Sequence, residues 1–260
     1  AGEAAPAVTA GAGDIPGVNG ASPAVRVVTD VLDLDIGLTG GTLRRADLLL
    51  YPVHKGEAEV VRLFDGSPPH PYVFQSGLTS SDTGAQPDHL ATFTAPAQEY
   101  RLADRQDELK IPLTWTNGQG LTVVKTFTFK RGQYAVTVDY DIDNQTGADW
   151  HAASYMQFMR TQAHHKRSMW NVESYAFRGP ALHDGTAYHK LDIDDEDERG
   201  YSQTVTNGWI ASMQHHFVAA AVPTVDQPYH FSLKVKDNTY MFSAVGSPQV
   251  VPAGRQQRIT

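Results

Sequence analysis

Three aspartates at alternate positions are the first residues whose type and spacing could do chemistry. Asp139, Asp141 and Asp143 alternate with Tyr140 and Ile142 in the stretch Asp-Tyr-Asp-Ile-Asp. Glycoside-cleaving enzymes use paired carboxylates as acid and base or nucleophile. This spacing places all three on one face of a strand, about 7 Å from one to the next. The solvent-facing side of an antiparallel sheet has the same pattern, so we interpret them as a wet strand face.

An acidic run is the second candidate, because clustered carboxylates can hold calcium. It reads Asp-Ile-Asp-Asp-Glu-Asp-Glu from Asp192 to Glu198. An EF-hand needs glycine at its sixth position and a carboxylate at its twelfth. Counted from Asp192, those positions hold Asp197 and Gln203, so the motif fails. We therefore predict a solvated loop, and an irregular calcium loop stays open as the alternative.

Histidines and nucleophiles add no recognisable catalytic or metal motif. His164-His165 and His215-His216 are adjacent pairs, and neighbours on a strand point to opposite faces. The chain has no cysteine, no His-Glu-x-x-His zinc motif, no nucleophile elbow and no glycine-rich phosphate loop. The residues thus predict no catalytic residue, no metal and no cofactor.

Composition limits the class of protein. The chain has 260 residues, 41% of them hydrophobic, with a net charge of −8. That charge argues against a nucleic-acid partner, which normally demands a basic face. No run of about eighteen apolar residues occurs, so we expect no membrane-spanning segment within the chain. Residues 1–23 are rich in Ala, Gly and Pro and predict a flexible linker, followed by one folded domain over residues 24–260.

The elements that must position these residues all have the period of strands. Tyr134, Val136, Val138, Tyr140 and Ile142 fall on one face of the aspartate strand, after a reversal at 130–133. Asn117-Gly118 predicts a tight hairpin before it. Further strands are expected at 25–36, 43–51, 72–78, 92–102, 109–115, 121–129, 150–158, 172–177, 188–193, 209–213, 217–222, 231–235 and 240–245. No segment holds a helical period, which predicts an all-β antiparallel fold of two large packed sheets.

Several segments, in order, resemble one known family. Lys125 to Asn144, with its Lys-Arg-Gly-Gln-Tyr-Ala-Val turn and strand, is similar to the large periplasmic domain of the YidC/Oxa1 family of membrane protein insertases. The same order is kept by the following matching segments: Thr29–Leu34, Gly40-Gly41, Tyr51-Pro52, Phe74–Leu78, Phe177–Ala181, Gly208–Phe217 and Val251–Gly254. Each motif is weak alone, and their collinearity over about 25–257 carries the resemblance.

The resemblance implies a fold, a place and a role. It implies a β-supersandwich like that of galactose mutarotase, between the first and second transmembrane helices of the insertase. The domain would face the periplasm at the Gram-negative inner membrane, with residues 1–23 as its tether. It would be non-catalytic and would assist insertion and folding of inner-membrane proteins, as a chaperone, through SecYEG, SecDF or nascent membrane proteins.

A carbohydrate-binding or mutarotase-like enzyme is the alternative that the same fold suggests. Mutarotase chemistry needs a general acid and base, usually Glu with His, facing each other across a cleft. Glutamates outside the acidic run, which include Glu57, Glu59, Glu99, Glu108 and Glu173, lie in no recognisable motif.

For partner contacts we predict four aromatic residues in the part of the chain that resembles the family least. They are Tyr155, Phe158, Trp170 and Tyr175. An extended partner chain could meet them in a groove or add a strand at a sheet edge. Burial of the same rings in the core is the competing interpretation.

Overall fold

A computed structural model describes residues 22–82, 84–162, 177–214 and 216–260. The linker expected at residues 1–23 lies outside the described residues except for Ser22 and Pro23, and it stays a prediction. The described residues contain strands, turns and loops and no helix. Accordingly, no helix in this part of the chain has the length and apolar character needed to cross a membrane.

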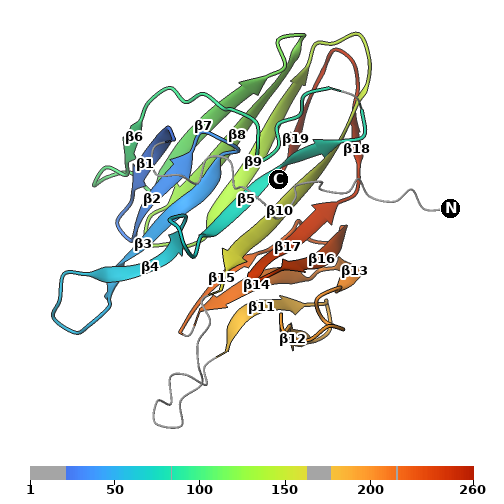
Figure 1. The fold of residues 1–260 in the computed structure, drawn as a ribbon. Coiled ribbons are helices and arrows are strands. Elements are labelled where there is room, and N and C mark those ends of the chain that lie inside the picture. The colour runs from blue at the N-terminus through green and yellow to red at the C-terminus, as the bar shows by residue number, and fades with distance from the viewer. Residues whose placement is uncertain (1–21, 83, 163–176, 215) are drawn as a thin grey trace.

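One large sheet of eleven strands forms the frame of the molecule (Figure 1). Its order is β13 (Ser202–Thr206), β16 (Pro228–Lys236), β17 (Thr239–Gly246), β10 (Trp150–Thr161), β5 (Tyr72–Ser80), β4 (Val60–Asp65), β3 (Thr42–Pro52), β2 (Leu32–Gly37), β1 (Ala24–Val28) and β6 (Glu99–Arg101), with β18 (Gln249–Val251) paired to one end of β10. All these pairs are antiparallel except β1 with β6.

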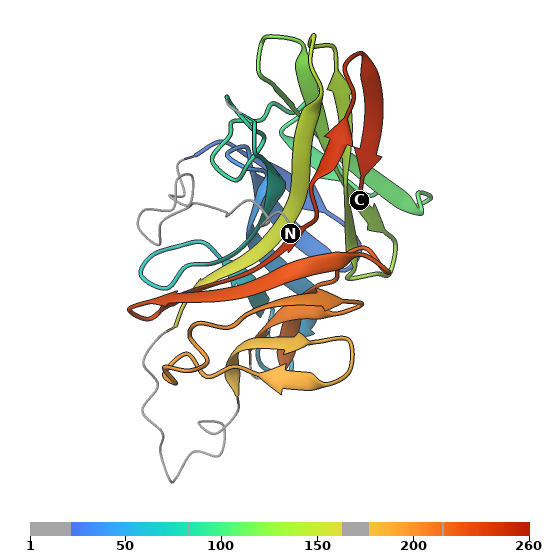
Figure 2. The same cartoon turned by 90° about the vertical axis from the view of Figure 1, so that its right-hand side faces the viewer.

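Two four-stranded sheets form the second layer (Figures 1 and 2). The β9 sheet has the order β19 (Arg255–Ile259), β9 (Val136–Asn144), β8 (Leu121–Lys130) and β7 (Glu108–Thr116). The β14 sheet has the order β12 (Tyr188–Lys190), β11 (Arg178–His183), β14 (Trp209–Gln214) and β15 (Phe217–Ala221). One cluster of buried apolar side chains joins all three sheets. The predicted all-β sandwich is confirmed, with its second layer divided in two.

The hairpin between β7 and β8 forms at Asn117-Gly118 as predicted. Gly118 has a φ of 71°, a conformation that glycine adopts without steric cost. The Asn117 side-chain oxygen accepts hydrogen bonds from the amides of Gln119 and Leu121, at 2.8 and 3.0 Å. The turn therefore closes through its own side chain.

The strand expected over 25–36 is wrong in one respect, because the chain reverses inside it. The Thr29 hydroxyl oxygen accepts hydrogen bonds from the amides of Val31 and Leu32, at 3.2 and 3.0 Å. Side-chain bonds of this kind compete with a continuing strand and favour a turn. β1 and β2 are consequently two strands of a hairpin, in which Val28 pairs with Asp33.

The aspartate strand is β9, and its interpretation as a wet face is confirmed. Asp141 receives two hydrogen bonds from the Arg258 guanidinium, at 2.6 and 2.9 Å. Asp139 accepts one from the Thr260 hydroxyl at 2.7 Å. Both partners belong to the segment around β19, a strand that the sequence analysis does not predict. The carboxylates of Asp139 and Asp141 therefore bond side chains of the neighbouring segment around β19.

A lysine lies at the centre of the contact between the large sheet and the β9 sheet. Lys125 on β8 is 0% exposed. Its ammonium donates to the carbonyl oxygens of Gly40 at 2.9 Å, Gly41 at 3.2 Å and Ser76 at 2.7 Å. The rings of Phe93, Phe127 and Tyr140 surround the nitrogen at 5.1 to 6.0 Å. A buried amine with three acceptors has all its donors satisfied.

Neutral polar side chains occupy the centre of the large sheet on adjacent strands β5 and β10. The Gln157 amide nitrogen donates to the Gln75 side-chain oxygen at 2.7 Å. Both glutamines are buried. Beside them, Val73, Met159 and Met241 form a small apolar cluster.

Candidate partner-binding surface

Three exposed or partly exposed rings from distant segments meet on the surface, and we call them the aromatic patch. Tyr51 lies at the end of β3, Tyr134 in the turn before β9, and Phe217 at the start of β15. The ring centroid of Tyr51 is 5.9 Å from that of Tyr134 and 5.5 Å from that of Phe217. Tyr51 is 45% exposed and Tyr134 40%. Rings gathered at the surface are typical of partner-binding sites.

A break in strand pairing positions Tyr51. The register between β3 and β4 shifts between Ala46 and Asp47, and it shifts again after Leu48, before Pro52 meets Val60. Such an irregularity bends a strand and redirects its side chains. The last residues of β3 therefore leave the core, and Leu50 is 63% exposed beside Tyr51.

The turn that carries Tyr134 is held to the body of the domain. The Arg131 guanidinium donates to the carbonyls of Gln106 at 2.9 Å and Ala103 at 2.6 Å. The Gly132 amide donates to the Asp30 carboxylate at 2.9 Å. These bonds place Tyr134 outside β9, and the expectation that it shares the buried face of that strand is wrong. Desolvation raises the pKa of the Tyr134 phenol, and electrostatic repulsion from Tyr51 and Asp30 raises it further.

An uncharged edge strand continues the aromatic patch. Among the described strands, β15 pairs only with β14, and no described strand pairs with its other edge. Its sequence from Phe217 to Val222 has no charged residue, and Val218 and Val222 are 53% and 65% exposed. Edge strands commonly carry charges that block strand addition. β15 lacks such charges, which suits pairing with an extended chain.

The structure describes two of the four residues predicted to contact a partner, and both are buried. Tyr155 and Phe158 on β10 are each 1% exposed. The Tyr155 hydroxyl accepts from the His89 amide at 2.7 Å, and Phe158 packs on Phe74 at 5.2 Å. Trp170 and Tyr175 lie outside the described residues. The prediction for these two therefore stays a prediction.

Other residues considered for chemistry lie apart from one another. The acidic run lies in exposed turns, as predicted, where only Ile193 is buried. Glu99 pairs with Arg101 at 3.3 Å and Glu108 with Lys110 at 3.0 Å, all of them exposed. Glu57 and Glu59 are exposed in the loop before β4, while His164, His165, Glu173 and His215 lie outside the described residues. No group of three metal-ligating side chains occurs in the described ranges.

Sequence reasoning missed the aromatic patch, although one signal was present. Apolar residues stand at neighbouring positions in Leu50-Tyr51 and Phe217-Val218. A half-buried strand alternates, so one member of each pair has to face away from the core. The pattern does not say that the two segments meet.

Comparisons with known proteins agree on one family. The YidC periplasmic domain family matches residues 24–260. The membrane protein insertase YidC of Thioalkalivibrio sulfidiphilus is 41% identical over 218 residues, which are 81% of this chain and 38% of that protein. YidC of Methylococcus capsulatus is 37% identical over 241 residues, which are 90% of this chain and 43% of that protein. The chain thus spans about two-fifths of the length of these relatives.

A solved structure confirms the fold class. It is a galactose mutarotase related enzyme from Lactobacillus acidophilus, with a TM-score of 0.54 and 7% identity, matched over 90% of this chain and 94% of that one. At that identity the likeness concerns the fold alone. With the family match over nearly the whole described domain and the insertase relatives above, the chain belongs to the YidC periplasmic domain family, at the periplasmic side of the inner membrane.

Proposed function

We propose that this domain is a non-catalytic docking module, which assists insertion and folding of inner-membrane proteins by binding Sec translocon components or emerging substrate chains. Its relatives are named membrane protein insertases, and the domain is their periplasmic part. In this proposal residues 1–23 act as a flexible linker to the folded domain.

The observation that carries the proposal is the aromatic patch next to an open strand edge. The rings offer apolar area with few rotatable bonds, which gives binding energy at a low entropic cost. The β15 backbone offers donors and acceptors to any extended segment, and pairing of this kind tolerates many sequences. Tolerance is what a module that meets many different substrate chains requires.

The non-catalytic part of the proposal is supported by the residues at the centre of the large sheet. Gln75 and Gln157 are neutral and bonded to each other, whereas mutarotase chemistry needs an acid and a base. The glutamates on β6 and β7 are engaged by exposed cations at strand edges. Clear anomerisation activity or selective sugar binding on a glycan array would overturn this part.

Photo-crosslinking in the full-length insertase tests the docking role. A photoreactive residue at Tyr51, Tyr134 or Val218 should crosslink to Sec subunits or nascent membrane proteins. The same residue at Gln119, in the exposed β7–β8 turn, is the control. The earlier predicted positions Tyr155, Phe158, Trp170 and Tyr175 belong in the same experiment, and Tyr155 and Phe158 should stay silent because they are buried.

A charge on the edge strand gives a second, independent test. Val218→Lys adds a cation to β15 at a site 53% exposed, so the domain should fold while strand addition is disfavoured. Val250→Lys, on β18 and 47% exposed, is the matched control. We expect crosslinking at Tyr51 to fall in V218K only. Equal crosslinking in V218K and V250K would remove the edge strand from the proposal, and silence at all surface positions would refute docking here.

A further inference from the structure

The outer face of the β14 sheet is built mostly from apolar and aromatic side chains. Strand residues alternate between two faces, and one set here, with Leu182, Ile210 and Ala221, belongs to the core cluster that joins the three sheets. Strand register places the other set together on the outer face. This set consists of Gly179, Ala181 and His183 on β11, Tyr188 and Lys190 on β12, Trp209, Ala211 and Met213 on β14, and Val218 and Ala220 on β15.

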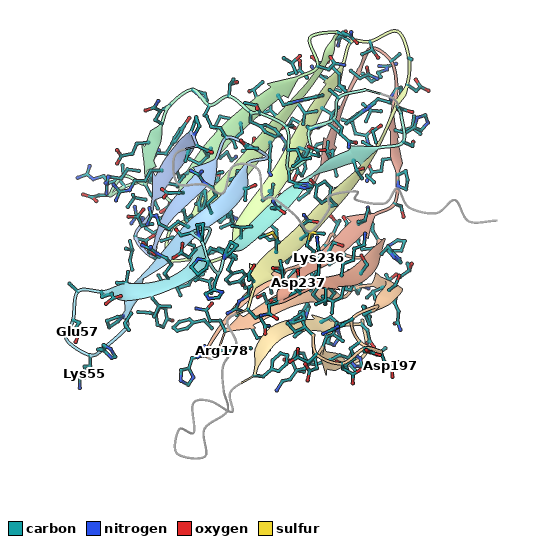
Figure 3. All side chains as sticks on the ribbon, in the orientation of Figure 1. Lys55, Glu57, Arg178, Asp197, Lys236 and Asp237 are labelled. Atoms are coloured by element: carbon teal, nitrogen blue, oxygen red, sulfur yellow. The ribbon has the colours of Figure 1, made fainter. Side chains whose placement is uncertain are left out.

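No carboxylate stands on this outer face, although the chain is acidic. The strand positions that form it include a lysine and a histidine and no Asp or Glu, whereas the whole chain has 29 acidic residues. Asp184, directly after β11, is held by His189 at 2.7 Å. Asp197 of the acidic run lies at the end of the β14 sheet away from Arg178, the first residue of β11 (Figure 3). These two carboxylates therefore lie at the ends of the sheet and not on its outer face.

Two aromatic rings lie across the centre of the outer face. The ring centroid of Tyr188 is 5.9 Å from that of Trp209, which is two strands away in the sheet. The Tyr188 hydroxyl donates to the Met213 sulfur at 2.8 Å, so the tyrosine side chain crosses β11. Ala181 and Ala211 are both 0% exposed and do not belong to the core cluster. Their cover therefore lies on the outer face, which has an apolar layer of its own.

Much of this apolar layer is open to solvent. Tyr188 is 46% exposed, Val218 is 53% exposed, and Val222, directly after β15, is 65% exposed. At the rim, the Lys190 ammonium nitrogen lies 5.2 Å from the centre of the Phe177 ring. Tryptophan and tyrosine favour the headgroup level of a bilayer, where their polar atoms meet water and their rings meet acyl chains. A lysine beside them can extend its ammonium toward lipid phosphates.

The place of the domain in the cell identifies an occupant for this face. The chain belongs to a family at the periplasmic side of the inner membrane, so a bilayer surface is near. A bilayer interface accepts aromatic rings and valines without demanding a matching pattern of hydrogen bonds. Anionic lipids repel carboxylates, and this face of an acidic chain has none among its strand positions.

We infer that the outer face of the β14 sheet is a lipid-docking surface, on which Trp209, Tyr188, Val218 and Val222 meet the headgroup region of the inner membrane. Contact of this kind holds the domain against the bilayer without any membrane-spanning segment. The ring of Phe217, which belongs to the aromatic patch, is on the opposite face of β15 from Val218. The inference does not rest on the docking role proposed above.

Vesicle binding tests the inference directly. The purified chain is mixed with vesicles of phosphatidylethanolamine and a minor share of phosphatidylglycerol, whose brominated acyl chains quench tryptophan fluorescence on contact. We expect the chain to sediment with the vesicles and its fluorescence to be quenched. Trp115 and Trp150 are 7% and 8% exposed, so Trp209→Phe should remove the quenching while vesicle binding remains. Absence of vesicle binding, or equal quenching in W209F, would overturn the inference.

A carboxylate placed on the face tests which surface meets the lipid. Val222→Asp changes a site that is 65% exposed, so the domain should fold, and vesicle binding should weaken by roughly tenfold. Val250→Asp, on β18 of the large sheet and 47% exposed, adds the same charge elsewhere and should bind like the parent chain. A thermal melt of each protein checks that it is folded. Equal vesicle binding by V222D and V250D would refute docking through this face.

Salt separates apolar contact from charge attraction. The chain has a net charge of −8, so vesicles that contain phosphatidylglycerol repel it as a whole. Salt screens this repulsion, and binding through apolar side chains should therefore stay equal or become stronger as salt rises. Binding that is lost as salt rises would mean that exposed cations carry it, and the inference would then be wrong.

Discussion

Two cations join the layers of this sandwich, and they differ in how closely the structure surrounds them. Lys125 links the β9 sheet to the large sheet, where its ammonium meets three backbone carbonyls and is 0% exposed. Arg160 links the large sheet to the β14 sheet, where its guanidinium bonds the Met213 carbonyl at the edge of a cavity. The same chemical device, a cation donating to carbonyls across layers, occurs at both junctions.

Lys125 and Arg160 differ in how deeply they are buried. All three donors of Lys125 are used, and burial lowers the pKa of its amine to about 7 from the ordinary 10.5. The guanidinium of Arg160 bonds the Met213 carbonyl, is only partly buried and borders a cavity. Water cannot replace the bonds of a sealed cation, whereas it can replace part of the bonds of a partly buried one. The predictions below test this contrast.

Removal of the Lys125 ammonium should lower the free energy of unfolding more than any other change predicted here. Lys125→Met leaves the carbonyls of Gly40, Gly41 and Ser76 without their donor in a buried site, which costs about 3–5 kcal/mol of unfolding free energy. Denaturant unfolding measures it. Lys234→Met, at an exposed site on β16, should change stability by less than about 0.5 kcal/mol. A loss as small in K125M as in K234M would show that the ammonium bonds contribute nothing.

The pH dependence of stability should identify Lys125 as a titrating group. Between pH 7 and 10.5 the unfolded chain binds more protons at this residue than the folded chain, because the folded pKa is about 7 and the unfolded one 10.5. Stability contributed by this group therefore rises with pH in that window, by roughly 1.4 kcal/mol per unit at most. Measurement from pH 7 to 9.5 avoids the tyrosines. The rise in unfolding free energy with pH should be present in the parent chain and absent in K125M. Parallel plots of unfolding free energy against pH for the two proteins would contradict this prediction.

Removal of Arg160 should cost less than removal of Lys125. Arg160→Met loses a charge-assisted bond to the Met213 carbonyl and the contact with Tyr72, about 1.5–3 kcal/mol. Water at the cavity can replace part of the lost bond, which it cannot do around Lys125. The same unfolding experiment compares the two variants. If R160M were as destabilised as K125M, the contrast between sealed and solvated junctions would be wrong.

A methyl group added at Gly41 should lower the free energy of unfolding by the smallest amount among these predictions. It tests how tightly the chain packs around Lys125. Gly41 has a φ of 58°, and an added Cβ would lie 3.0 Å from the Lys125 ammonium nitrogen. Gly118, with a φ of 71°, has nothing within 4 Å of that position. Gly118→Ala thus measures the backbone cost alone, about 1 kcal/mol. Gly41→Ala should cost about 1 kcal/mol more. Equal losses of unfolding free energy in Gly41→Ala and Gly118→Ala would mean that the residues around Lys125 can move to make room for the added methyl group.

Local patterns predicted much of the fold, for physical reasons that are themselves local. Alternation identified β7, β8 and β9, since one face of each is more deeply buried than the other, whereas β10 alternates in sequence but is buried on both faces. Asn117-Gly118 predicted its hairpin because glycine tolerates positive φ. The same reasoning failed where side chains compete with the strand, as at Thr29, and where the strand is short and polar, as in β13 and β19.

The candidate sites were hardly predictable, because each depends on which segments meet. Lys125 is one of several lysines in a polar-apolar alternation, and only the approach of Gly40 and Ser76 reveals its role. Tyr51, Tyr134 and Phe217 are separated by more than eighty residues at each step, so nothing local joins their rings. Tyr155 and Phe158, chosen for their aromatic character, are buried by strands on either side of β10.

The sequence by itself determined the class of this protein: an all-β domain without cysteine, acidic overall, whose ordered motifs identify its family. Such properties follow from alternation, turn residues and collinear matches, which need no knowledge of long-range contacts. Only the tertiary structure decided which cation is sealed between sheets, which borders a cavity, and where exposed rings gather. Burial and donor satisfaction are properties of packed neighbours, and in a sandwich those neighbours come from strands far apart in the chain.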